Sequence, residues 1–171
     1  YKPWDPKETV VSKWVITLAN VYNRSREKNG VESIGKDLCG YDIVLFRFGN
    51  PNAQLNRVMI DCQMHGNEYY GHEALYALIK WLLTSSDSEA KRILQNNEVL
   101  IVPCVNYRWG RTNWNVPSWM TALDPGDKGK CGVNLNRNFS PTYSAGLSDN
   151  NSDSYSGIGP DSEKETRALI N

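Results

Sequence analysis

Two nearly continuous apolar runs constrain the fold more than any other feature of the sequence. They cover residues 58–63 and 99–105, and such runs are typical of strands that helices cover on both faces. Between them, apolar residues recur at helical spacing over residues 75–83, and a second short helix is predicted from Ser88 to Gln95. This strand–helix–strand order predicts a layered α/β fold.

Further elements are predicted on both sides of this unit. Two extended segments, 31–35 and 41–48, form a hairpin. An amphipathic helix lies within residues 5–30, and a last helix opens with a capping box of Ser162 and Glu165. We therefore expect a three-layer α/β/α architecture with a mixed, mostly parallel central sheet. We also expect truncation at the C-terminus, because the chain abandons its last helix there.

The composition indicates one soluble domain, since 40% of the 171 residues are hydrophobic and 22% are charged. The 19 basic residues balance 19 acidic ones, so the net charge gives no electrostatic footprint for nucleic acid or an anionic membrane. No apolar run approaches the ~20 residues that span a bilayer. These observations favour a small neutral substrate or a peptide as the partner, with no nucleic acid and no membrane.

The first group of candidate functional residues follows the earlier apolar strand. His65 and Glu68 are three residues apart, and a turn through Gly66 and Asn67 can bring an imidazole nitrogen and a carboxylate to one metal ion. Ligands in open α/β sheets gather at the carboxyl ends of strands, where His65 is expected. Zinc suits these ligands, and an open position for water suits hydrolysis. A chance occurrence of the two residues is the alternative.

A second interpretation of the same segment is a continuous helix. It would place His65, Glu68 and His72 on one face and supply three ligands from one element. Gly66 and Gly71 are poor helix residues and disfavour it. His72 is therefore interpreted as a packing or surface histidine.

Two further segments carry arginine among polar residues. Within residues 134–139, which follow a short predicted strand, Arg137 can grip a carboxylate by two hydrogen bonds and Asn136 can add a third. Taken alone, this segment also fits a solvated loop. Residues 110–113 place Arg111 among aromatic residues, a pattern that alone indicates no function.

Together, and in this order, these three segments resemble the zinc metallocarboxypeptidase family of carboxypeptidase A-like and carboxypeptidase N/E-like enzymes. The resemblance implies that His65 and Glu68 bind Zn²⁺. It also implies that Asn136 and Arg137 clamp the terminal carboxylate of the substrate. By the same resemblance, Arg111 is the catalytic arginine that stabilises the oxyanion.

Some features of the chain depart from the family pattern. Asn67 stands where the digestive members carry an arginine that contacts substrate, and residues 106–108 lack the usual Pro-Asp-Gly, which leaves Arg108 as the other candidate for the oxyanion role. The family completes its zinc site with a later histidine and then adds a tyrosine and a general-base glutamate, whereas no histidine follows His72. We therefore expect residues 1–171 to be the amino-terminal portion of a single zinc carboxypeptidase catalytic domain.

The function that the resemblance implies is zinc-dependent removal of C-terminal residues from peptides or proteins, a hydrolase activity in which metal-activated water attacks the scissile carbonyl. We expect this chain alone to be inactive, because it lacks the third zinc ligand and the general base. The missing carboxyl-terminal part of the domain is then an expected partner. A non-catalytic or inactive domain of the same fold that binds peptide tails is the alternative.

The cellular location rests on the resemblance. Most members with this layout are secreted or lysosome-like and some are cytosolic, so the resemblance implies a secreted or extracellular protein. The sequons at Asn23, Asn138 and Asn150 carry little weight, because Asn and Ser are abundant in the chain. Cys62 and Cys104 lie within the apolar strand runs and are expected to be buried thiols.

Overall fold

The computed structural model describes residues 30–37, 40–50, 52, 56–65, 68, 70–106, 133–144 and 155–171. The predicted helix within residues 5–30 lies outside the described residues, as do Asn67 and the segment that carries Arg108 and Arg111.

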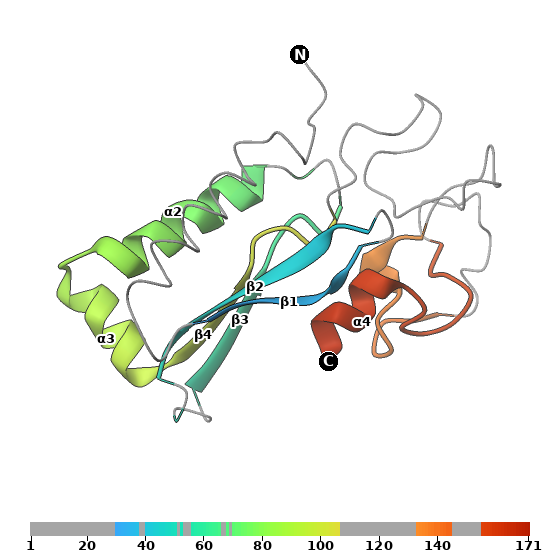
Figure 1. Cartoon of the computed structure of the whole chain (residues 1–171). Coiled ribbons are helices and arrows are strands. Elements are labelled where there is room, and N and C mark those ends of the chain that lie inside the picture. The colour runs from blue at the N-terminus through green and yellow to red at the C-terminus, as the bar shows by residue number, and fades with distance from the viewer. Residues whose placement is uncertain are drawn as a thin grey trace, which may run out of the picture.

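Strands and helices follow one another in the predicted order (Figure 1). They are β1 (Gly30–Lys36), β2 (Asp42–Gly49), β3 (Arg57–Asp61), α2 (Tyr70–Thr84), α3 (Ser88–Asn96), β4 (Glu98–Val102), the 3₁₀ helix η2 (Leu135–Arg137) and α4 (Lys164–Ile170). The start of α3 has a local cause, because the side chain of Asp87 accepts a hydrogen bond from the N–H of Glu89 at 2.9 Å. Among the described helices, none combines the length and apolarity that a bilayer crossing requires.

The described strands form one sheet in the order β1-β2-β4-β3. β1 and β2 form the predicted antiparallel hairpin, β2 pairs antiparallel with β4, and β3 pairs parallel with β4. The sheet is therefore mixed, as predicted. Among the described strands two of the three pairings are antiparallel, so the expected predominance of parallel pairing is not seen in them. The two apolar runs are neighbours, with Val58 opposite Val99 and Ile60 opposite Ile101.

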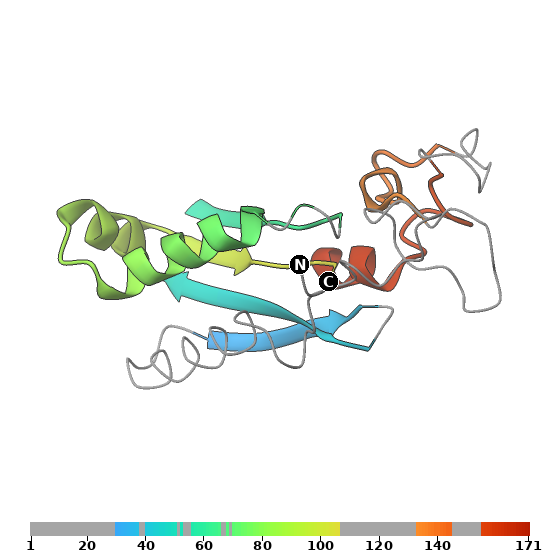
Figure 2. The same ribbon diagram turned by 90° about the horizontal axis from the view of Figure 1, so that it is seen from above.

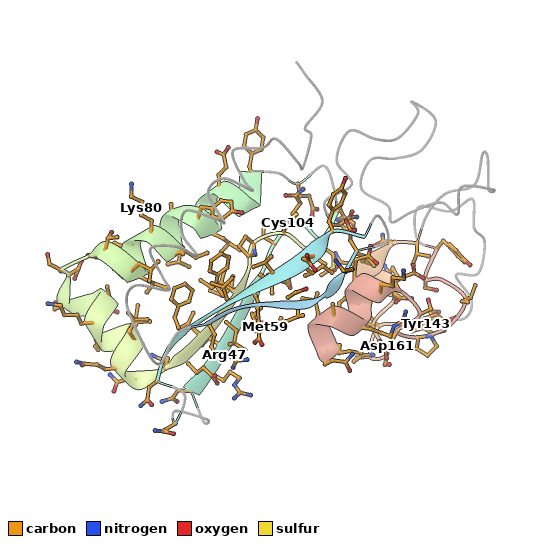
Figure 3. The ribbon with its side chains drawn as sticks, in the orientation of Figure 1. Arg47, Met59, Lys80, Cys104, Tyr143 and Asp161 are labelled. Carbon is orange, nitrogen blue, oxygen red and sulfur yellow. The ribbon has the colours of Figure 1, made fainter. Side chains whose placement is uncertain are left out.

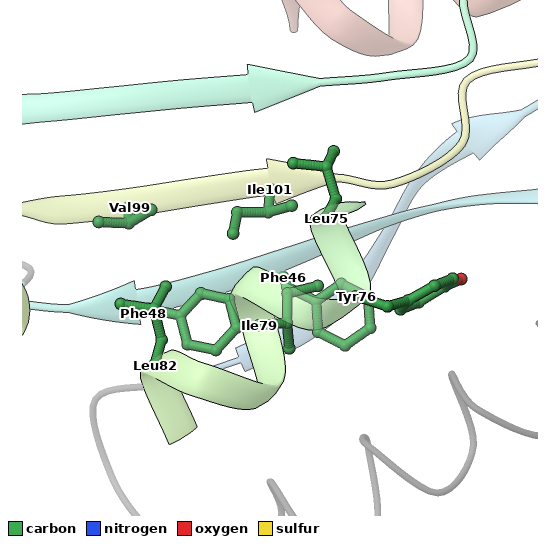
Figure 4. Packing of buried hydrophobic residues seen from close by; sticks show 8 residues of the cluster. All are labelled: Phe46, Phe48, Leu75, Tyr76, Ile79, Leu82, Val99 and Ile101. Carbon is green, nitrogen blue, oxygen red and sulfur yellow. The ribbon is translucent and has the colours of Figure 1, made fainter. Parts of the chain in front are cut away.

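Helices cover both faces of the sheet and give the predicted three layers. On one face, α2 packs on β2 and β4, and Figure 4 shows Ile79 of α2 against Phe46, Phe48 and Ile101. The cluster on the opposite face consists of Ile43, Leu45, Leu100, Val102, Val105, Leu135 and Ala168. Burial of such side chains contributes roughly 1.5–3 kcal/mol each. Ala168 belongs to α4 and Leu135 to η2, so this second cluster packs both elements against the sheet. Figure 2 shows that α4 lies apart from α2 and α3.

Burial differs between the two apolar strands. Every residue of β4 is buried, as predicted for a strand covered on both faces. In β3, four of the five residues are exposed and Ile60 is partly buried. The prediction of cover on both faces is therefore confirmed for β4 and wrong for β3, because β3 lies at the edge of the described sheet.

Two local predictions are wrong. The capping box of Ser162 and Glu165 does not form, because Glu163 is the N-cap, its side chain makes no cap bond, and Glu165 is buried. The oxygen Oγ of Ser162 instead accepts a hydrogen bond from Nδ2 of Asn138 at 2.9 Å. The strand predicted ahead of Asn136 is also missing from the described residues, since residues 133 and 134 are not in a strand and the chain turns into η2 at Leu135. In both places tertiary contacts outweigh the local preference.

Candidate metal and carboxylate site

Backbone hydrogen bonds continue beyond the paired ends of β3 and β4 and fix the start of the site. The N–H of Cys62 donates to the carbonyl of Val102 at 3.0 Å, and the N–H of Val105 donates to the carbonyl of Cys62 at 3.1 Å. Gln63 is buried and adopts a left-handed conformation with φ 52°, which is uncommon for a residue other than glycine. This turn ends the strand and leads to His65 at the carboxyl edge of the parallel pair, where α/β sheets place ligands.

His65 and Glu68 lie in contact beyond this turn. Nδ1 of His65 is 2.9 Å from Oε1 of Glu68, and the N–H of His65 donates to Oε2 of Glu68 at 3.1 Å. The N–H of Glu68 donates to the carbonyl of His65 at 3.0 Å and closes the turn. The alternative of one helix through His65, Glu68 and His72 is wrong, because α2 begins at Tyr70. The side chain of His72 lies outside the described residues.

Asn134 determines which nitrogen of His65 carries the proton. Its Oδ1 accepts a hydrogen bond from the N–H of Asn136 at 3.1 Å, so this atom is an acceptor, and it lies 3.1 Å from Nε2 of His65. Nε2 is therefore the protonated donor. In the neutral ring, Nδ1 then directs its lone pair at Oε1 of Glu68, which is also an acceptor.

Two acceptors that face each other at 2.9 Å repel unless a cation joins them. A second proton on the imidazole satisfies the contact, and so does a divalent metal ion bound by both groups. An imidazole nitrogen and a carboxylate oxygen belong to the ligand set of catalytic zinc sites, in which a partner of the other ring nitrogen orients the ring. His65 and Glu68 therefore fit a zinc ion. Within the described part of the chain, no three His, Cys, Asp or Glu side chains are placed to hold a metal.

The predicted carboxylate receiver lies next to this pair. Asn136 and Arg137 belong to η2, and both are exposed. The side chain of Asn134 caps η2, and Leu135 anchors it in the core. Nη1 of Arg137 donates to the carbonyl of Asn136 at 3.3 Å, and no described carboxylate forms an ion pair with Arg137. The planar guanidinium is thus open to a carboxylate from outside.

Asn134 joins the two predicted clusters and is the residue of the site that sequence reasoning missed. It lies 69 positions from His65, so no local pattern indicates the contact. Its preference for N-cap positions was the available signal. An N-cap preference predicts the hydrogen bond from Asn134 to the start of η2, but it does not predict the contact with His65. Arg111 lies outside the described residues, so the structure brings together four of the five predicted site residues.

Two cysteines follow the same strand ends, and both are free thiols. Cys104 is buried, as predicted, and Cys62 is partly buried; Figure 3 shows Cys104 in the interior of the molecule. Burial raises the pKa of each thiol, so both remain protonated at neutral pH. Because the thiolate is the form that binds metal or attacks a substrate, these side chains do not compete with His65 and Glu68.

Comparisons with known proteins agree with this geometry. The zinc carboxypeptidase family matches residues 16–171. Carboxypeptidase O of Homo sapiens is 30% identical over 127 residues, which cover 71% of this chain and 33% of that protein. Carboxypeptidase B of Bos taurus is 28% identical over 179 residues, which cover 99% of this chain and 40% of that protein.

A solved structure shares the fold. Carboxypeptidase A from Helicoverpa armigera superposes with a TM-score of 0.72 at 23% identity, covering 98% of this chain and 41% of that one. The chain spans 33% of the length of human carboxypeptidase O and 50% of its Bos taurus counterpart. Because the family match covers most of the sequence, this chain belongs to the zinc carboxypeptidase family of Zn²⁺-dependent peptidases.

Proposed function

We propose that this chain forms the amino-terminal part of a metallocarboxypeptidase domain that removes C-terminal residues from peptides, with zinc bound by His65 and Glu68. One observation carries the proposal. Nδ1 of His65 and the carboxylate of Glu68 converge at 2.9 Å, while Asn134 occupies the other ring nitrogen. Membership in a zinc-dependent family makes zinc the metal that fits this pair.

His65, Glu68 and Asn134 have different roles in the proposed zinc site. Oδ1 of Asn134 accepts a hydrogen bond from the Nε2–H group of His65, which keeps the proton on Nε2 and leaves the lone pair of Nδ1 for metal binding. Glu68 contributes an anionic oxygen, which lowers the net charge of the site. Zinc, when bound, lowers the pKa of a water molecule and polarises the scissile carbonyl.

The arginine side of the site recognises the end of the substrate. An exopeptidase must distinguish a free terminal carboxylate from an internal peptide bond, and the exposed fork of Arg137 can form two parallel hydrogen bonds to that group. Hydrogen bonds to charged groups contribute about 1.5–3 kcal/mol each. Asn136 adds a neutral partner. Stabilisation of the oxyanion is assigned to Arg111 by resemblance, with Arg108 as the other candidate.

The remaining zinc ligand and the general base are assigned to a part of the domain outside this sequence. Two considerations support this assignment. The chain spans 33% of human carboxypeptidase O, and no histidine follows His72. That remaining part is then the partner with which this chain forms an active domain. An extracellular location is proposed from the resemblance.

Zinc binding by the purified chain tests the proposal. Titration calorimetry should detect one weak zinc site, and His65→Ala and Glu68→Ala should each abolish it, because each removes one ligand. His72→Ala is the matched control, since His72 is the only other histidine, and its zinc binding should equal that of the wild type. Unchanged zinc binding in both His65→Ala and Glu68→Ala would falsify the proposal.

A non-catalytic domain that binds peptide tails is the second candidate function. It is favoured by the exposure of Arg137, whose guanidinium has no carboxylate partner among the described residues. Such a domain would bind a terminal carboxylate equally well with and without a chelator. The peptidase proposal instead requires that chelation abolish release of C-terminal residues by the complete domain.

A further inference from the structure

Asn138 is the most completely bonded polar side chain next to the site. It is 0% exposed. Its Nδ2 group lies within hydrogen-bond distance of the carbonyl of Ser156 at 2.8 Å, the carbonyl of Gly159 at 3.1 Å and Oγ of Ser162 at 2.9 Å. Its Oδ1 accepts a hydrogen bond from the N–H of Glu163 at 3.1 Å. One amide thus links the end of η2 to the segment that leads into α4.

The space around this amide admits no other group. Gly157 has φ 90°, and a Cβ atom there would lie 2.8 Å from Nδ2 of Asn138 and 2.7 Å from Oγ of Ser162. The backbone is tied as well, because the N–H of Asp161 donates to the carbonyl of Asn138 at 2.7 Å. The carboxylate of Asp161 in turn accepts hydrogen bonds from the backbone N–H, at 2.8 Å, and the hydroxyl of Ser140.

These contacts lie next in sequence to an exposed arginine. Arg137 precedes Asn138, and Nη1 of Arg137 donates to the neighbouring carbonyl of Asn136 at 3.3 Å. The position of its Cα atom therefore depends on how η2 is held. Asn134 fixes the first end of that helix and Asn138 fixes the last.

We propose that Asn138 is a positioning residue for the carboxylate receiver, holding Arg137 at a fixed distance from the His65–Glu68 pair. This inference rests on the proposed function of Arg137. A buried amide suits the task because it donates and accepts at once, so it can bind carbonyls on one side and an N–H on the other without burying a charge. Asp cannot replace it, since a carboxylate does not donate to the carbonyls of Ser156 and Gly159.

The experiment compares binding of an acetylated dipeptide with a free C-terminal carboxylate to binding of its C-terminal amide, using the purified chain with zinc. The ratio of the two affinities isolates recognition of the carboxylate. Arg137→Ala should abolish the preference for the free acid. Asn138→Asp should reduce the ratio about tenfold, the order expected when one charge-assisted hydrogen bond is lost. Asn97→Asp is the matched control, because Asn97 also donates its amide to a carbonyl, that of Ile93, but in α3.

Ser162→Ala is a second, milder variant that tests the same hydrogen bonds if Asn138→Asp does not fold. It removes one acceptor of Nδ2 and leaves the two carbonyls, so it should fold and lower the ratio to a smaller extent. Thermal unfolding confirms that each variant is folded. A folded Asn138→Asp or Ser162→Ala chain with the wild-type ratio overturns the positioning role while the role of Arg137 stands. A wild-type chain that binds acid and amide equally, or an Arg137→Ala chain that keeps the preference, overturns the proposed function and the positioning role with it.

Discussion

β3 and β4 have almost the same character in sequence and opposite environments in the fold. Both are short apolar runs, and they pair in parallel with Val58 opposite Val99. Yet Val99 is 5% exposed and Val58 is 45% exposed. Their place in the sheet makes the difference, because β4 lies between β2 and β3 whereas β3 pairs with β4 alone among the described strands. An apolar run thus identifies a strand without determining how much of it is buried.

The largest effect expected from this comparison is on the valine pair. Val99→Ala should lower the free energy of unfolding by about 2 kcal/mol, because it removes buried methyl groups from the cluster between the sheet and α2. Val58→Ala removes the same atoms from an exposed position and should change it by less than about 0.5 kcal/mol. Chemical denaturation of both variants measures the difference. Equal losses would mean that β3 is as well covered as β4.

A smaller effect is expected at the ion pair that links the two strands. The carboxylate of Glu98 in β4 is buried and contacts Arg47 at 2.6 Å and Arg57 of β3 at 2.5 Å. Burial alone would raise the pKa of Glu98, but the hydrogen bonds from both arginines outweigh it and hold this pKa below its usual range. Glu98→Gln should therefore cost about 1 kcal/mol, a modest value because both arginines are partly exposed and screened by solvent.

The pH dependence of this contribution has a definite sign. A lowered pKa in the folded state means that the stabilisation is complete above the pKa of the unfolded chain and is lost as the pH falls through the folded value. The free energy of unfolding of the wild type should therefore exceed that of Glu98→Gln at neutral pH, and this difference should disappear as the pH falls below the usual pKa range of a carboxyl group. Glu89→Gln is the comparison, since Glu89 pairs with Arg92 on the surface of α3. The hydrogen bond from Arg92 also lowers the pKa of Glu89, so this variant should change the curves in the same direction but less, because solvent screens the exposed pair. A Glu98→Gln deficit that persists at low pH would refute this account.

The smallest effect on stability is expected at Met59. This side chain is 43% exposed on β3, where Figure 3 labels it, and an exposed apolar edge strand is a template for association. Met59→Lys should leave the free energy of unfolding almost unchanged and reduce self-association in sedimentation at high protein concentration. A wild-type chain that sediments as a monomer at the same concentration would count against this expectation.

Much of the fold could be predicted from periodicity, because a period of two or 3.6 residues survives in a single sequence. The hairpin of β1 and β2, the helices α2 and α3 and both apolar strands are confirmed. The exposure of β3 could not be predicted, since interior and edge strands share one pattern. The capping box failed for a related reason, because Oγ of Ser162 is committed to Asn138, 24 positions away.

The candidate site divides in the same way. The approach of Glu68 to His65 depends on a turn of three residues, so local spacing was sufficient to predict it. The contact of His65 with Asn134 spans the whole central part of the chain and leaves no trace in local spacing. The order of the motifs indicated that the His65–Glu68 pair and the Asn136–Arg137 pair belong to one site. The structure shows that Oδ1 of Asn134 contacts both His65 and the backbone of Asn136.

The burial of Asn138 has a consequence for modification of the protein. Asn138, Phe139 and Ser140 form a sequon, and transfer of an oligosaccharide requires access to the same Nδ2 atom that donates to Ser156, Gly159 and Ser162 in the folded chain. Folding and glycan attachment therefore compete for one nitrogen. A chain that is already folded when it meets the transferase would therefore carry no sugar at Asn138.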